Sequence, residues 1–252
     1  MAWGNFLNIP CPIKKWDEKL NKLMLTMLPA IGLIAGLVLF GVALLLNMAP
    51  IPVIIKGFIL TFFLYHISGF IHLDGFMDCA DAVLSRRDLE ERRRILKDSS
   101  VGAFAVISLV LLVLGTFTAL TGLEESIGGA GDLLVLILVP VVSRGISGAC
   151  VLQYKPLSTS QYSETRGSKK GVFVIAIQLA IVLVVIIAVF CNTEKSIYVA
   201  VFGAGVTAIA TGMTAYLCSR NLEGMNGDIA GCAISMGEFA GFMAAAVVAA
   251  VM

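Results

Sequence analysis

Apolar runs long enough to cross a membrane recur along this sequence, and they restrict the chain to one class of fold. Seven such runs fall roughly at residues 28–46, 52–71, 101–121, 133–152, 172–191, 197–218 and 232–251. Each has about the 20 residues that an α-helix needs to span the hydrocarbon core of a bilayer. Only 14% of all residues are charged, compared with about 25% in soluble domains. We therefore expect an all-α, polytopic integral membrane helix bundle with about seven transmembrane helices, folded as a single membrane-embedded domain over residues 1–252.

The basic residues between the runs predict the orientation of the chain. Fifteen lysines and arginines lie in residues 1–27, 73–100, 153–171 and 219–231, and one lies in the other connections. Positively charged flanks stay in the cytoplasm, so we expect a multi-pass protein of the cell membrane with a cytoplasmic N-terminus and a cytoplasmic segment 73–100. Residues 1–27 interleave aromatic side chains with lysines, which suits either a segment on the surface of the lipid bilayer or a solvated tail. The net charge of +1 does not suggest nucleic acid as a partner.

Three aspartates in the segment 73–100 stand at helical spacing. Asp74, Asp78 and Asp81 occupy positions i, i+4 and i+7, and on a helix they fall within about 60° of one another. Like charges at this spacing destabilise a helix. A divalent cation such as Mg²⁺, which prefers oxygen ligands, would resolve the repulsion. We therefore favour a metal site over a structural role for this acidic stripe.

Two further motifs are expected on the same face of the membrane. A basic run with Arg93 and Lys97 leads into KDSSVG at 97–102, whose hydroxyl and backbone N–H groups suit an anion. A glycine-rich turn at 223–231 carries Asp228. Carboxylates, cations and glycine turns together suit a metal-bridged diphosphate. The alternatives are a basic run that anchors the chain to anionic lipid and an ordinary tight turn.

Ionisable residues inside apolar runs need separate explanations, because they are costly in hydrocarbon. Arg144 and Glu238 either pair with each other or contact the same substrate. His72 is a candidate substrate contact or base, whereas His66 is better explained as a satisfied core residue. The six cysteines are scattered and form no CxxC pattern, so we expect small apolar fillers without a disulfide framework or a zinc site.

The motifs resemble those of the cobalamin 5′-phosphate synthase family, also called adenosylcobinamide-GDP ribazoletransferases. The family pattern H-x-D-G-x-x-D-x-x-D-G corresponds to residues 72–82, K-D-S-x-x-G to 97–102 and G-x-T-G-D-x-x-G to 224–231. The FLNIPCP start and the multi-span layout extend the resemblance over nearly the whole chain. The sequence departs from the pattern at Ala82, where the family usually has glycine, and at Asn226, where it usually has threonine.

The resemblance implies a transferase that joins adenosylcobinamide-GDP to α-ribazole or its 5′-phosphate and releases GMP, in the last steps of cobalamin biosynthesis. For this reaction we hypothesise roles for individual residues in this sequence. Mg²⁺ would be held by Asp74, Asp78, Asp81 and Asp228, and the catalytic residues would be Asp81 as the base, His72 and Arg144. The substrate and phosphate contacts would be Arg93, Lys97, Asp98, Ser99, Gly102, Asn226, Gly227 and Glu238.

Two other classes of protein remain as alternatives. A CDP-alcohol phosphotransferase of phospholipid synthesis also binds a metal through acids on membrane helices, but its pattern has Ala-Arg soon after the first Asp-Gly, and this sequence has Asp78-Cys79 there. A cation-coupled carrier would place its acids near the middle of the bilayer, whereas these cluster at one face. A homo-oligomer is possible for any of these classes.

Overall fold

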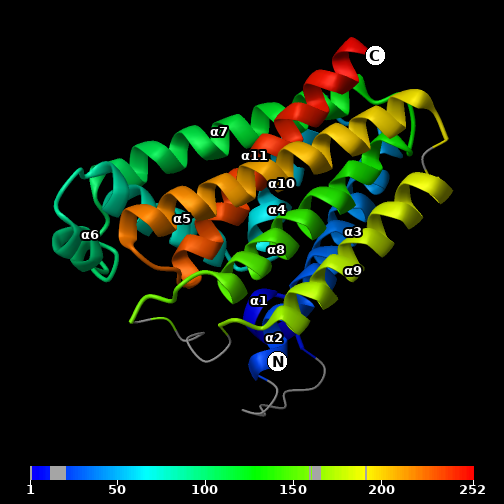
Figure 1. Cartoon of the computed structure of the whole chain (residues 1–252). Helices are drawn as coiled ribbons and strands as arrows, with labels where there is room; N and C mark the ends of the chain where they lie inside the picture. The colour runs from blue at the N-terminus through cyan, green and yellow to red at the C-terminus, as the bar shows by residue number, and fades with distance from the viewer. Residues whose placement is uncertain (1, 12–20, 159, 161–165, 191) are drawn as a thin grey trace.

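The structure, a computed structural model, describes residues 2–11, 21–158, 160, 166–190 and 192–252. Helices account for nearly all of this part of the chain (Figure 1). They are α1 (Ala2–Phe6), α2 (Asn21–Met24), α3 (Leu28–Asn47), α4 (Val53–His66), α5 (Ile71–Leu84), α6 (Leu89–Ile95), α7 (Ala103–Ser126), α8 (Val135–Gln153), α9 (Lys169–Val185), α10 (Glu194–Leu222) and α11 (Gly227–Val251). No strand occurs among the described residues, so the all-α prediction is confirmed.

Six of the described helical segments are long and apolar enough to cross a membrane. Helix α8 forms the centre of the bundle. It contacts α3, α9, α10 and α11, and 89% of its most apolar stretch is buried inside the protein. Helix α9 lies at the edge of the bundle, and only 17% of its most apolar stretch is buried. It therefore exposes apolar side chains where lipid would surround the protein. This arrangement confirms a polytopic membrane helix bundle.

Glycines allow the central helices to approach closely. In α3, a Cβ atom added at Gly36 would lie 2.6 Å from the Cα atom of Ile137 in α8, and Gly32 faces the backbone of Pro140 in the same way. Small residues four apart are typical of helix pairs in membranes, because without side chains between them the two backbones can make extensive van der Waals contact. The Gly32–Gly36 pair therefore explains how α3 and α8 pack.

The second apolar run does not form the single span expected over residues 52–71. Helix α4 ends at His66, and α5 begins at Ile71 at an angle of 83° to it. Between them Gly69 and Phe70 have φ values of +59° and +62°, a left-handed conformation that ends a right-handed helix. With 14 residues, α4 is about 21 Å long, shorter than the roughly 30 Å hydrocarbon core. In the described part of the chain, the helices long and apolar enough to span a membrane therefore number six, or seven if the bent pair counts as one.

Helices α10 and α11 extend further toward each other than expected. The loop predicted at 219–231 shrinks to the four residues Glu223–Asn226, between Leu222 at the end of α10 and Gly227 at the start of α11. Asn226 caps α11 by accepting a 3.1 Å hydrogen bond from the backbone N–H of Ile229. Asp228 consequently lies in the first turn of a long helix rather than in the expected glycine-rich turn before it.

Part of the N-terminal segment packs against the bundle. Leu7 is buried with Ile31 and Ala35 of α3 and with Ile67 of the α4–α5 turn, and the backbone N–H of Asn8 donates to the Ile67 carbonyl. The lysines at 14, 15 and 19, on which the expected surface position of residues 1–27 depends, lie outside the described residues.

Candidate active site

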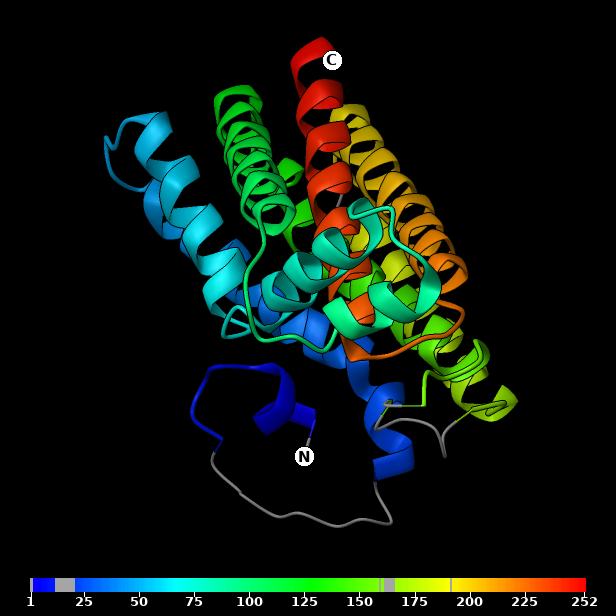
Figure 2. The ribbon, with the colours of Figure 1, turned by 90° about the vertical axis from the view of Figure 1, so that its left-hand side faces the viewer.

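The acidic stripe, the basic run and the KDSSVG segment meet at one end of the bundle, the end that faces the viewer in Figure 2. A cavity of about 310 Å³ opens there between α5 and the segment that leads into α7. We call it the carboxylate cavity. Its lining residues are Asp74, Met77, Asp78, Asp81, Leu96, Lys97, Asp98, Ser99, Ser100, Val101 and Ala105.

Asp74 and Asp78 present free carboxylates to this cavity. Both lie on α5, so the predicted helical stripe is confirmed. Asp74 is exposed and Asp78 is half-buried, and within the described part of the chain neither side chain accepts a hydrogen bond. Their negative charges repel each other at short range. The two carboxylates therefore have oxygens available for a cation or a proton.

Asp81, the third member of the stripe, is used as a helix cap. Its Oδ2 accepts a 2.6 Å hydrogen bond from the backbone N–H of Gly102, and its Oδ1 accepts a 2.8 Å bond from that of Ala105. These N–H groups lie at the N-terminal end of α7, where the partial positive charge of the helix also favours a carboxylate. Asp81 is buried, and it fixes the KDSSVG segment against α5. This geometry favours a positioning role over the predicted role as a base.

The KDSSVG segment is held by its own aspartate. Asp98 Oδ1 accepts hydrogen bonds from both the backbone N–H (2.9 Å) and the hydroxyl (2.7 Å) of Ser100. These two hydrogen bonds hold the pKa of the Asp98 carboxyl below its usual value, and the one from the backbone N–H has the larger effect. Asp98 is thus a structural acceptor that shapes the loop, while Lys97 and Ser99 remain exposed on the cavity wall.

Arg93 docks helix α6 onto the end of α10. Its Nε donates to the Leu222 carbonyl at 2.9 Å and its Nη2 to the Glu223 carbonyl at 3.3 Å. A cation is favoured at these unpaired carbonyls, where the helix dipole is negative. Arg93 also lines a second cavity, of about 500 Å³, together with Glu90, Arg94, Lys97 and Asp98. A basic wall therefore continues outward from the carboxylate cavity through Lys97.

Asp228 approaches the stripe from the start of α11. Its backbone touches α5 so closely that a Cβ atom added at Gly75 would lie 2.6 Å from the Asp228 carbonyl oxygen. The side chain of Asn226 donates a 2.6 Å hydrogen bond to Asp228 Oδ2, and the Asp228 charge acts on Asp74 and Asp78. Asn226 and Gly227 thus build the start of α11.

The carboxylate oxygens at this site are the type of ligand that a hard cation prefers. Among the described residues no three carboxylates come within 4.8 Å of one another, since Asp81 is turned toward α7 and Asp228 toward Asn226. Mg²⁺ does not need a closed protein cage, because it usually keeps several waters and binds through one or two carboxylates plus substrate phosphates. Free oxygens on Asp74 and Asp78, with Asp228 beside them, meet that requirement.

Arg144 and Glu238 pair with each other inside the bundle. Arg144 Nη1 donates to Glu238 Oε1, and Arg144 Nη2 donates to Ser68 Oγ at 3.0 Å. Both side chains are almost fully buried and neither lines the carboxylate cavity. His72 lies close enough for the Arg144 charge to act on it, and its buried Nε2 has no hydrogen-bond partner. The structure therefore realises the pairing alternative and gathers these three residues behind the cavity.

One grouping escaped the sequence interpretation. Cys79, Cys218 and Cys232 come together, with their Sγ atoms within 4.8 Å of one another. The expectation that all six cysteines are scattered apolar fillers is therefore wrong for these three. No local pattern could have revealed the group, because its members lie on three different helices and Cys79 is far from the other two in the sequence.

The fold and the site define a class: a polytopic membrane protein with an acidic and basic cavity at one end of a helix bundle. Within that class, the family model described as cobalamin-5-phosphate synthase matches residues 1–246. The chain belongs to this family.

Individual relatives agree with the family match. The adenosylcobinamide-GDP ribazoletransferase of Clostridium perfringens (strain 13 / Type A) is 34% identical over 244 residues, which are 96% of this chain and 94% of the relative. Proteins with the same name from Clostridium botulinum (strain Alaska E43 / Type E3) and Alkaliphilus oremlandii (strain OhILAs) are 34% and 30% identical. They cover 97% and 88% of this chain, and the matched parts are 95% and 85% of those relatives. No solved structure matches the chain.

Proposed function

We propose that this protein is an adenosylcobinamide-GDP ribazoletransferase of cobalamin biosynthesis. It joins adenosylcobinamide-GDP to α-ribazole or α-ribazole 5′-phosphate, giving adenosylcobalamin or its 5′-phosphate and GMP. The observation that carries the proposal is the carboxylate cavity, where free acids face a lysine and a hydroxyl, in a chain that matches the family over residues 1–246.

In this proposal, the diphosphate of adenosylcobinamide-GDP binds in the carboxylate cavity. Asp74, Asp78 and Asp228 would hold Mg²⁺, which neutralises charge on the diphosphate and on the departing GMP. Lys97 and Ser99 donate hydrogen bonds to phosphate oxygens from the opposite wall, and Arg93 extends this positive wall outward. Asp81 and Asp98 keep the loop that carries these donors in place.

The chemical step is an attack by a ribose hydroxyl. Its oxygen forms a bond to the phosphorus attached to cobinamide, the P–O bond to GMP breaks, and GMP leaves with the bonding electron pair. The proton of the hydroxyl passes to a carboxylate with a free oxygen, which in this cavity means Asp74 or Asp78. Asp81, predicted from the sequence to be this base, has both oxygens occupied by backbone N–H groups.

Arg144, Glu238 and His72 contribute from behind the cavity. The ion pair joins α8 to α11, and Arg144 reaches the α4–α5 turn through Ser68. In this position the pair sets where α5 and α11 lie, and with them Asp74 and Asp228. We therefore propose positioning roles for these residues, in place of the direct substrate contacts expected from the sequence.

We propose that the cavity opens to the cytoplasm. The basic residues of the segments 73–100, 153–171 and 219–231 support this orientation, since positive flanks are retained on that side. A cytoplasmic opening would give the cavity direct access to nucleotide substrates.

The test is a reaction with purified protein in detergent. Adenosylcobinamide-GDP, α-ribazole and Mg²⁺ are supplied, and GMP and the cobalamin product are measured by chromatography. We expect both products in equal amounts and their loss when EDTA is added. A folded sample that makes no cobalamin but releases CMP from CDP-diacylglycerol and an alcohol would replace the proposal with a phospholipid phosphotransferase.

A further inference from the structure

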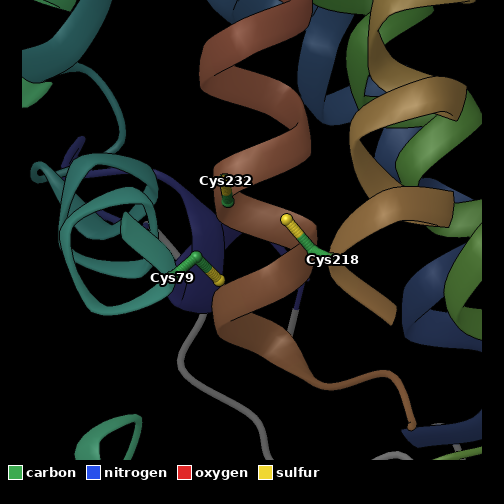
Figure 3. A group of neighbouring side chains, drawn as sticks. All are labelled: Cys79, Cys218 and Cys232. Atoms are coloured by element: carbon green, nitrogen blue, oxygen red, sulfur yellow. The ribbon is translucent and has the colours of Figure 1, made fainter. Parts of the chain in front are cut away.

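Three thiols meet where the helices that carry the site cross. Cys79 of α5, Cys218 of α10 and Cys232 of α11 point toward one another (Figure 3), and their Sγ atoms all lie within 4.8 Å of one another. We call them the thiol cluster. The three residues are free cysteines. The reaction proposed above uses none of them, so their convergence needs its own explanation.

The environment of the thiol cluster is that of a ligand site with limited access. The exposed fractions of Cys79 and Cys232 are 1% and 5%, whereas Cys218 as a whole residue is partly buried. Among the described residues no histidine or carboxylate joins the group within the same distance. The available donors are therefore three sulfur atoms and nothing harder.

We propose that the thiol cluster binds a single soft, thiophilic cation with filled d orbitals, and that Cu(I) is the ion it fits. Soft thiolates select Cu(I) over hard ions such as Mg²⁺. A trigonal ion with metal–sulfur bonds of about 2.3 Å requires sulfur–sulfur distances of about 4 Å. The cluster needs to contract by less than about 1 Å to reach that geometry, a change within the range of side-chain torsions. Structural Zn²⁺ sites close with about four ligands, one more than this group supplies.

The position of the thiol cluster gives such an ion a structural consequence. Cys79 directly follows Asp78, and Cys232 lies four residues, about one helical turn, after Asp228. A bound ion would tie α5, α10 and α11 together just behind the carboxylates. It binds the folded protein better than the unfolded chain, which does not preassemble the three thiols, so it raises the unfolding temperature. Each thiol that binds as a thiolate releases its proton.

The experiment uses full-length protein, purified without oxygen in detergent and titrated with Cu(I) against a chromogenic Cu(I) chelator. We expect one tight equivalent and a rise in unfolding temperature. Cys79→Ser, Cys218→Ser and Cys232→Ser should each weaken binding at least about tenfold. Cys150→Ser is the matched control, since Cys150 is also a buried free cysteine but lies on α8 outside the cluster, and it should bind Cu(I) like the wild type.

X-ray absorption on the Cu(I)-loaded wild type keeps the test independent of how the variants fold. The proposal requires a first shell of three sulfur atoms. A shell with nitrogen or oxygen ligands, a stoichiometry unaffected by the three cluster variants, or tighter binding of Zn²⁺ than of Cu(I) would each overturn it. None of these readouts depends on the transferase activity, so this inference stands or fails separately from the proposed function.

Discussion

The backbone N–H of Gly102 donates a 2.6 Å hydrogen bond to Asp81 Oδ2, and this contact joins the two motifs that surround the carboxylate cavity. It links the last turn of α5 to the residue just before α7, across 21 positions of sequence. The contact leaves no room for a side chain at position 102, because a Cβ atom there would lie 2.6 Å from Asp81 Oδ1. The acidic stripe and the KDSSVG loop therefore form one unit, held by an acid that resembled a third metal ligand.

Replacement of Asp81 by asparagine tests this positioning role. The amide has one acceptor oxygen where the carboxylate has two, so one N–H of α7 loses its partner. We expect the free energy of unfolding to fall by about 1–2 kcal/mol, activity to fall in part, and the Mg²⁺ concentration for half-maximal activity to stay unchanged. Thermal unfolding and Mg²⁺ titrations of the rate measure these effects.

Asp88→Asn is the control for that variant, because Asp88 caps α6 by accepting from the Glu91 N–H but does not line the carboxylate cavity. It should retain full activity. If Asp81→Asn were as stable as the wild type and completely inactive, Asp81 would be the base predicted from the sequence.

Gly75→Ala should separate the carboxylates of α5 from Asp228. The added methyl group would lie 2.6 Å from the Asp228 carbonyl oxygen and 2.8 Å from its Cα atom, so the two helices must move apart. We expect a loss of about 1–3 kcal/mol in stability and a loss of activity that extra Mg²⁺ partly restores. Gly205→Ala in α10 has nothing within 4 Å of the new atom and should match or slightly exceed the wild type in stability. Equal unfolding temperatures for the two variants would contradict this packing.

The Arg144–Glu238 pair can be tested as a pair. Glu238→Gln alone leaves a buried guanidinium without its counter-charge, and we expect a loss of about 3–5 kcal/mol in the free energy of unfolding. The double variant Arg144→Met/Glu238→Leu removes both charges and should regain most of that stability. A positioning role predicts that activity returns along with stability. A folded but inactive double variant would instead support the substrate contact expected for Arg144 from the sequence.

Asp78→Asn should change the response of the protein to Mg²⁺ before any substrate is present. Removing this charge relieves repulsion from Asp74, Asp228 and Asp81, so without metal the variant should unfold at a higher temperature than the wild type. The wild type should gain stability as Mg²⁺ is added, and the variant should gain less. Glu90→Gln, which removes an exposed charge outside the carboxylate cavity, should respond to Mg²⁺ like the wild type. Identical Mg²⁺ responses in Asp78→Asn and the wild type would argue against a metal at this acid.

Much of this architecture could be predicted from the sequence because membrane helices are determined by local composition. The length of the apolar runs indicated the bundle, and the spacing of Asp74 and Asp78 indicated one face of a helix. The bend after His66 was not predictable from hydropathy, since Ile67 and Phe70 are as apolar as a span requires. It depends on Gly69 and Phe70 adopting positive φ values.

The parts of the site that the sequence left open or did not reveal depend on contacts between distant segments. Nothing near Asp81 in the sequence indicates that its oxygens meet the start of α7. Similarly, the pairing of Arg144 with Glu238 spans 94 positions, and it stood as one of two alternatives until the helices were placed. The convergence of Cys79 with Cys218 and Cys232 requires the three-dimensional packing of α5, α10 and α11. Charge and spacing indicate which residues are unusual, and packing decides which of them meet.

The most direct test of the proposed role of the α5 carboxylates is the rate of GMP release from adenosylcobinamide-GDP in the presence of α-ribazole and saturating Mg²⁺. It should be compared between the wild type, Asp78→Asn and Glu90→Gln, all shown to be folded by thermal unfolding. The wild type and Glu90→Gln should release GMP, and Asp78→Asn should release none above background. Full GMP release by a folded Asp78→Asn variant would contradict the central claim that the carboxylates of α5 carry the transfer.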